Sequence, residues 1–253
     1  MAVEPVARPF GLGTEIGSII LTAATNVAVN RMLPGSAYVP ASLGAAGSLT
    51  WFARRGGAGW SDMGMAPSNI GKGLRLGFLV SVPVAAVVSL GIALPATRRF
   101  FIDERLRHTE RREILYETLV RIPFGTALAE EILFRGALSG TFRLRRSRVA
   151  SEVMSCAMFG LWHVLPTIDR LGRNPAGRRV SGSFRVLAAT LGGGVLMTAA
   201  AGFGLARLRD RTGSLAAPAV VHGALNSLAY LGSVWISRAS RQQPAPLGPA
   251  WVI

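Results

Sequence analysis

The chain has 253 residues, half of them hydrophobic and only 16% charged, which lies outside the composition of ordinary soluble domains. Its net charge of +15 comes almost entirely from arginine, and the arginines stand between apolar windows rather than in one patch, which argues against nucleic-acid binding. The single cysteine, Cys156, excludes an intramolecular disulfide and a cysteine-based zinc site. The sequence therefore indicates an integral membrane protein.

Apolar windows long enough to cross a bilayer recur along the chain. They predict an all-α fold, a polytopic bundle of about seven transmembrane helices that forms one membrane domain over residues 1–253. The windows are residues 10–29, 38–53, 76–95, 114–142, 149–166, 186–208 and 215–236. Basic residues are almost equally divided between the two sides of such a bundle, so the positive-inside rule gives no orientation.

The segments between these windows are read from their composition. The first window contains Glu15 and is too long for the core of a signal peptide, so it is expected to be a retained helix. Residues 54–75 predict an interfacial loop with a short helix after Ser68, and residues 100–113 predict an amphipathic helix on the membrane surface. The proline-rich residues 239–253 predict a flexible tail.

Arginine runs at the window ends are expected to anchor the helices to anionic lipid headgroups. This interpretation places the arginines at the bilayer surface and makes the lipid bilayer itself a partner. The runs are Arg143, Arg145, Arg146 and Arg148, and then Arg207, Arg209 and Arg211.

Two adjacent glutamates and an arginine interrupt the fourth window, in the stretch AEEILFR at residues 129–135. Each charge costs about 2.5–3.5 kcal/mol at mid-bilayer, so three would cost about 8–10 kcal/mol without compensation. Glu131 and Arg135 are four residues apart on one helix face, which predicts an ion pair. Glu130 lies about 100° around the helix and is left to face a cavity, where it could act as a general base.

Two later windows carry further polar residues at helical spacing. Phe159 and His163 are four residues apart, and Pro166 predicts the end of that helix. His222 and Asn226 are also four apart, in VVHGALNSL. With the free glutamate, three helices then supply a carboxylate, two imidazoles and a carboxamide, which is an inventory for activating a water and holding an oxyanion. Packing histidines, an interhelical asparagine and a structural ion pair are the alternative interpretation.

These residues form three signatures that resemble the CPBP family of intramembrane proteases, which includes the CAAX prenyl endopeptidases and bacteriocin-processing proteins of the Abi type. The resemblance covers roughly residues 110–232, which would be the catalytic core, and residues 211–222 resemble the family's usual lead-in to the third signature. The signatures are EExxxR in Glu130, Glu131 and Arg135, FxxxH in Phe159 and His163, and HxxxN in His222 and Asn226.

The resemblance implies an intramembrane endopeptidase that acts on a membrane-associated or C-terminal peptide. It implies that Glu130 and His163 activate the attacking water, while His222 and Asn226 stabilise the tetrahedral oxyanion. The implied supporting residues are Glu131 and Arg135, which orient the helix that carries the glutamates, and Phe159, which packs beside the site.

Metal dependence is left open by the sequence. Glu130, His163 and His222 match the ligand types of catalytic zinc sites, so zinc is the alternative cofactor. We favour a reaction without a cofactor, because the spacing is not HExxH and Asn226 suits an oxyanion hole better than a metal shell.

Two other functions are compatible with the same polar residues. The first is a non-proteolytic scaffold or bacteriocin-immunity protein that keeps the polar core for packing. The second is a proton-coupled transporter, which the absence of an inverted repeat disfavours. The arginine-rich, lysine-poor composition, with Lys72 as the only lysine, suggests a bacterial chain in the cell membrane. The sequence leaves the physiological substrate undetermined.

Overall fold

The computed structural model describes residues 11–180 and 183–240, and the regular elements in those residues are all helical. The N-terminal half holds α1 (Gly11–Val27), η1 (Ala28–Met32), η2 (Gly35–Ala37), α2 (Tyr38–Gly56), η3 (Pro67–Asn69), α3 (Ile70–Ala93), α4 (Pro95–Arg98), η4 (Arg99–Phe101) and η5 (Glu104–His108). The C-terminal part holds α8 (Arg148–Trp162), α9 (Val164–Arg173), α10 (Pro175–Val180), α11 (Phe184–Thr212) and α12 (Ala216–Ala239).

Between these two halves runs one continuous helical stretch, residues 111–143, which we call the glutamate helix. It alternates between α-helical and wider π-helical turns. Its segments are α5 (Arg111–Tyr116), η6 (Glu117–Leu128), α6 (Ala129–Glu131), η7 (Ile132–Leu138) and α7 (Ser139–Arg143).

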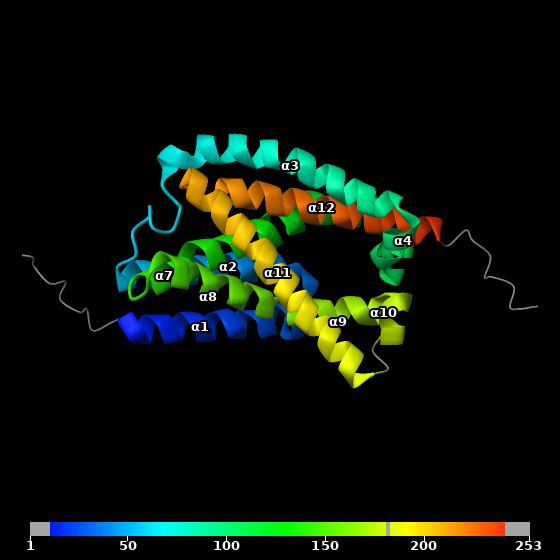
Figure 1. Cartoon of the computed structure of the whole chain (residues 1–253), viewed down its shortest axis with the longest axis horizontal. Coiled ribbons are helices and arrows are strands. Elements are labelled where there is room, and N and C mark those ends of the chain that lie inside the picture. Colours follow the sequence, from blue (N-terminus) through cyan, green and yellow to red (C-terminus); the bar gives the residue numbers. More distant parts are fainter. Residues whose placement is uncertain (1–10, 181–182, 241–253) are drawn as a thin grey trace, which may run out of the picture.

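The helices pack as a bundle around the glutamate helix (Figure 1). Helices α3 and α12 run side by side along one edge, and α11 crosses the bundle obliquely to pack on α8. On the other side, α1 and α2 pack against each other and against the second half of the glutamate helix. The predicted all-α membrane bundle is therefore confirmed.

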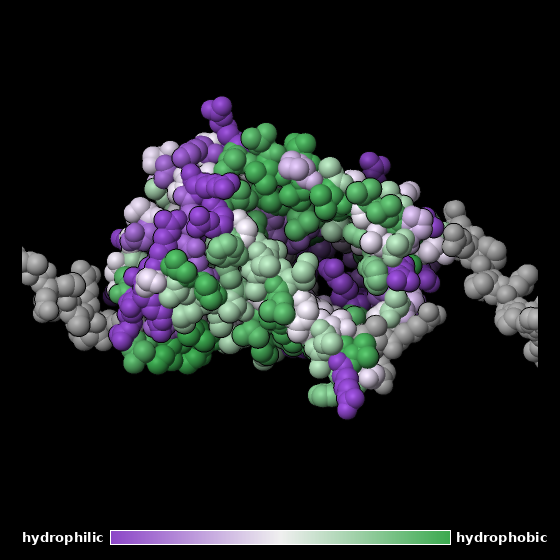
Figure 2. All heavy atoms as spheres, viewed as in Figure 1, coloured by the Kyte–Doolittle hydropathy of each residue, from purple (hydrophilic) through white to green (hydrophobic). Residues whose placement is uncertain are grey.

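Within the described residues, five helices are long and apolar enough to cross a membrane: Leu12–Met32, Pro67–Ala93, Arg148–Arg173, Phe184–Thr212 and Ala216–Ala239. The chain is a multi-pass membrane protein. Only 11% of the apolar window in the second span and 6% of that in the fourth are buried, so these helices present their side chains outward. Figure 2 shows the resulting hydrophobic surface over α3, with hydrophilic residues gathered towards the end of the molecule that holds α7.

The count of seven spans remains a prediction, because two of the windows lie on helices outside this set of five. One is α2, whose apolar part is short. The other is the glutamate helix, whose five charged residues between 117 and 135 lower its hydropathy. Three of these charges are buried inside the bundle, where other helices supply their partners: Glu130, Glu131 and Arg135 are at most 4% exposed.

Three expectations about local structure were wrong. The helix after Ser68 is not short, because α3 begins at Ile70 and continues to Ala93. Residues 100–113 do not form one amphipathic helix: Asp103 caps the short turn η5, and α5 begins only at Arg111. Pro166 does not end a helix, since α8 stops at Trp162 and the proline lies in the first turn of α9, where it is tolerated. The predicted tail lies almost wholly outside the described residues.

The loop between α2 and α3 packs closely against the C-terminal half of the glutamate helix. Met63 is fully buried, and a Cβ atom added at Gly136 or Gly140 would come within 2.8 Å of the side chain of Met65 or Met63 respectively. The backbone N–H of Leu215 donates to the carbonyl of Gly64, which ties the same loop to the start of α12. Gly136 and Gly140 thus let the loop approach the glutamate helix closely, and this contact fixes the glutamates relative to α12.

Candidate active site

The predicted ion pair between Glu131 and Arg135 is present in the interior of the bundle. The Arg135 Nη1 to Glu131 Oε1 distance is 3.0 Å, and the guanidinium carbon lies 3.9 Å from the centre of the Phe159 ring. Arg135 Nη2 has no hydrogen-bond partner among the described residues. This nitrogen lies against Gly202 of α11, where an added Cβ would approach it to 2.6 Å.

His222 contacts both glutamates. Its Nδ1 lies 2.9 Å from Glu131 Oε1, and Nδ1 is the donor of this hydrogen bond when the carboxylate is ionised. Its Nε2 faces Glu130 Oε2 at 3.8 Å, which is too long for a direct hydrogen bond. Spacing along one helix could not reveal the contact of His222 with Glu131, because the two residues are 91 positions apart.

Glu130 is 4% exposed and has a partner that sequence reasoning missed. The indole Nε1 of Trp162 donates a hydrogen bond of 3.0 Å to Glu130 Oε1, whereas Oε2 accepts none from the described residues. The expectation of a carboxylate free of partners therefore holds for one oxygen only. The available signal was the tryptophan itself, since a buried indole N–H usually needs an acceptor.

His163 lies at the break between α8 and α9, with φ −84° and ψ 0°. Its Nδ1 is 2.8 Å from the backbone oxygen of Phe159, which can only accept, so Nδ1 donates and the lone pair of the neutral ring is on Nε2. The Phe159 ring packs edge to face on both imidazoles, at centroid distances of 4.5 Å to His163 and 5.9 Å to His222. Phe159 thus packs beside the site as expected.

The last predicted site residue, Asn226, follows His222 by one turn on α12. Its side chain is half-buried and makes no hydrogen bond within the part of the chain that the structure describes. The structure therefore joins Glu130, Glu131 and His222 by direct contacts. Phe159 packs on the rings of both His163 and His222, and no side-chain hydrogen bond joins Asn226 to the other site residues in the described part of the chain.

A comparison with protein families identifies this region of the chain. Residues 114–228 match the family described as type II CAAX prenyl endopeptidase Rce1-like. The match spans a little under half of the chain, and we call these residues the Rce1-like domain. The match confirms the resemblance to CPBP-type proteases, and it covers every residue of the three signatures. No curated protein and no solved structure matches the chain.

Within residues 11–180 and 183–240, no three His, Cys, Asp or Glu side chains converge on a position that could hold a metal ion. Glu130 and His222 approach each other at 3.8 Å, and the Nδ1 of His163 is held by the backbone oxygen of Phe159. Zinc stays the alternative cofactor, and the reaction proposed for this site uses no metal.

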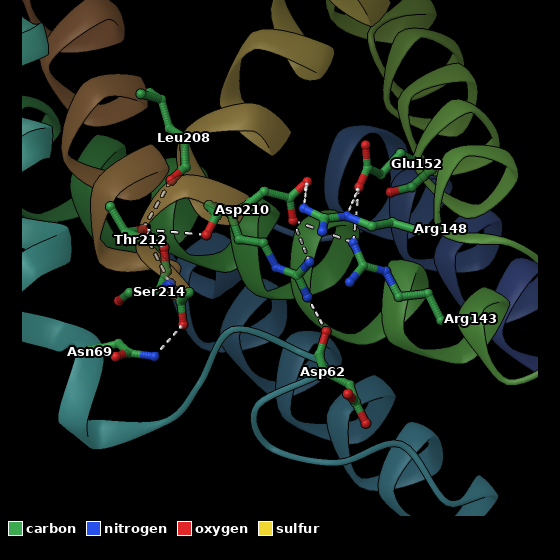
Figure 3. A network of polar contacts seen from close by, with 12 residues as sticks. Asp62, Asn69, Arg143, Arg148, Glu152, Leu208, Asp210, Thr212 and Ser214 are labelled. Atoms are coloured by element: carbon green, nitrogen blue, oxygen red, sulfur yellow. Dashed lines mark hydrogen bonds and ion pairs between the residues drawn. The ribbon is translucent and has the colours of Figure 1, made fainter.

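A second charge cluster is formed by Arg143, Arg148, Glu152 and Asp210 (Figure 3). Arg143 and Arg148 reach Glu152 and Asp210 at 2.7–3.4 Å. Between this cluster and Arg135 is a cavity of about 10 Å³, which has room for about one water molecule.

The interpretation of these arginines as lipid anchors is therefore wrong for four of the seven, Arg143, Arg146, Arg148 and Arg209, which pair with groups of the protein. Arg209 is 4% exposed and donates to the backbone oxygen of Asp62, and Arg146 pairs with Glu15. Carboxylates and a backbone carbonyl take the place of headgroups as their partners. Glu152 lies four residues after Arg148 on α8 and Asp210 is next to Arg209, but the other partners lie far along the chain, where spacing within one helix cannot reveal them.

Proposed function

We propose that the chain is an intramembrane endopeptidase in which Glu130 activates the attacking water. The observation that carries the proposal is the gap of 3.8 Å between Glu130 Oε2 and His222 Nε2, in the interior of the Rce1-like domain. Both atoms are polar, and Glu130 Oε2 has no hydrogen bond to the described residues. A water bonded to both would lie beside the line that joins them, because 3.8 Å is too short to hold a water between them.

In the proposed reaction, this water gives a proton to Glu130 Oε2 while its oxygen attacks the scissile carbonyl carbon. The electron pair of the carbonyl double bond moves to oxygen and forms the tetrahedral oxyanion. Glu130 then returns the proton to the leaving amine as the C–N bond breaks, which yields a carboxylic acid and an amine. One carboxylate therefore both accepts the proton from water and returns it to the leaving amine.

The remaining residues have proposed supporting roles. The free Nε2 lone pair of His163 is suited to accept the second hydrogen of the water. His222 in its charged form would donate from Nε2 to the oxyanion, and Glu131 on Nδ1 would stabilise that charge. Asn226 would add an amide donor one turn further along α12. Arg135 fixes Glu131 through their ion pair.

We propose that the substrate is a peptide segment presented within or at the bilayer, in the cell membrane of a bacterium. The family description supports a peptide substrate, and the spans that face outward support presentation from lipid. The arginine-rich composition with one lysine supports the bacterial assignment.

A non-proteolytic membrane scaffold is the second candidate, favoured by the contacts of one glutamate. Glu131 holds both Arg135 and His222 with less than 1% of its own surface exposed, which is what a purely structural polar core would require. In this case Glu130 would be dispensable and Glu131 would be essential for the folded chain.

The test compares the purified chain with Glu130→Gln in nanodiscs, using a peptide library read by mass spectrometry, with and without chelator. Glu113→Gln is the matched control, because this glutamate is exposed and lies on the same helix. We expect cleavage by the unmodified chain and by Glu113→Gln, no cleavage by Glu130→Gln, and no effect of chelator. Undiminished cleavage by Glu130→Gln would refute the mechanism, and loss with chelator that zinc reverses would replace it with a metal reaction.

A further inference from the structure

Trp162 lies in the core of the bundle and directly precedes His163, but it belongs to none of the three signatures. Its side chain is 5% exposed, and its ring packs edge to face on Phe134 at a centroid distance of 5.5 Å. Its Nε1 donates to Glu130 Oε1 at 3.0 Å. The chain thus connects the base of the proposed reaction to a fixed aromatic ring.

We propose that Trp162 is a positioning residue for Glu130. The terminal torsion of a glutamate has broad preferences, so a carboxylate without contacts can rotate and exchange its two oxygens. The indole N–H holds Oε1, and this leaves Oε2 facing His222. Because an indole N–H is a donor only, it cannot take the proton that Glu130 receives from water. The proposal rests on the proposed role of Glu130 as the base.

The backbone of Trp162 is held as firmly as its ring. The break of α8 at His163 leaves carbonyls near the helix end without the usual partner in the next turn. The side-chain nitrogen of Asn26 donates to the Trp162 carbonyl at 2.8 Å, and Asn26 lies on α1, outside the matched residues 114–228. The same hydrogen bond positions His163, the next residue in the chain. Helix α1 therefore anchors two residues of the proposed site.

The test separates the N–H group from the shape of the ring. Replacing Trp162 by 3-benzothienylalanine keeps the bicyclic ring and substitutes sulfur for the N–H group, while Trp162→Phe deletes both the N–H group and part of the ring. Trp235→Phe, at a residue on α12 that is 62% exposed, is the matched control. We expect kcat to fall by about 10- to 100-fold in both variants at position 162, with KM changed less than twofold. The control should leave both constants unchanged.

Unchanged kcat in the benzothienylalanine protein would overturn the proposal, and this variant decides the question if Trp162→Phe does not fold. A measurement without turnover separates failure of the contact from failure of the proposed function. The ultraviolet resonance Raman band of the indole N–H, isolated by subtracting the Trp162→Phe spectrum, should shift in Glu130→Leu. An unshifted band would overturn the contact even in an active enzyme, whereas a shifted band in a chain that cleaves nothing would refute only the protease function.

Discussion

Replacing Gly202 by alanine tests how α11 holds Arg135 in place. A Cβ at this position would lie 2.6 Å from Arg135 Nη2 and 2.9 Å from the Phe159 ring. Ordinary contacts between such atoms are about 3.5–4.0 Å, so the guanidinium must move by about 1 Å. The ion pair with Glu131 and the stacking on Phe159 restrict that movement.

The magnitude follows from comparison with a second glycine on the same helix. Overpacking of this kind costs about 1–3 kcal/mol, while replacing a helical glycine by alanine gains up to about 1 kcal/mol in helix propensity. Gly204→Ala receives the gain without the clash, because nothing lies within 4 Å of its added Cβ. The difference between the two variants should therefore be about 1–3 kcal/mol, with Gly202→Ala the less stable.

The assay is reversible unfolding in mixed micelles of increasing SDS content, combined with kcat on any substrate found in the library. A displacement of about 1 Å in the residue that orients Glu131 and His222 should lower kcat by about 10- to 100-fold in Gly202→Ala. Equal stability and equal kcat in the two glycine variants would refute the reasoning, because it would show that Arg135 is not confined by α11.

Two further predictions concern charges outside the proposed site. Asp210→Asn removes the carboxylate that Arg209 reaches at 2.9 Å, and both side chains are at most 6% exposed, so it should lower the free energy of unfolding in mixed micelles by about 3 kcal/mol. Asp169→Asn, at a carboxylate whose side chain is 27% exposed, should change it by less than about 1 kcal/mol, and equal effects would contradict this account. The hydrogen bond from Arg178 holds the pKa of the Glu104 carboxyl below its usual 4.5. The pair therefore stabilises the folded state fully at a pH above the pKa of the unfolded chain, and this stabilisation is lost as the pH falls through the pKa of the folded chain. Hydrogen exchange of the backbone around Glu104, measured relative to the intrinsic exchange rate at each pH, should therefore accelerate as pH falls below about 4. This pH dependence should be absent in Arg178→Ala. A transition that survives in Arg178→Ala would refute the assignment.

The parts of the site that sequence could predict are those set by helical periodicity. The pair of Glu131 and Arg135 follows from a spacing of four residues, and so does the packing of Phe159 beside His163. The hydrogen bond of Trp162 to Glu130 spans 32 residues and depends on how α8 crosses the glutamate helix. No periodicity within one helix encodes such a crossing.

The fold shows the same division between local and tertiary information. Runs of apolar residues identified the membrane helices, because length and hydropathy are local properties. The arginines that pair inside the protein were wrongly predicted to contact lipid headgroups. An arginine that pairs with Asp210 and one that meets a headgroup have the same sequence context. The buried charges of the glutamate helix likewise depend on partners from α8 and α12 in addition to the pair of Glu131 with Arg135.

The contact between the α2–α3 loop and the glutamate helix bears on how this protein can be cut into fragments. Residues 114–228 match the family, but Met63 and Met65, from outside that segment, pack on Gly136 and Gly140 together with Leu215. Asn26 likewise comes from α1 to satisfy the Trp162 carbonyl. A fragment cut at the ends of the matched residues would expose this face of the glutamate helix and leave the Trp162 carbonyl without its hydrogen-bond donor. The matched segment is thus smaller than the packed bundle, and moving it into another protein requires carrying the first two helices and their loop with it.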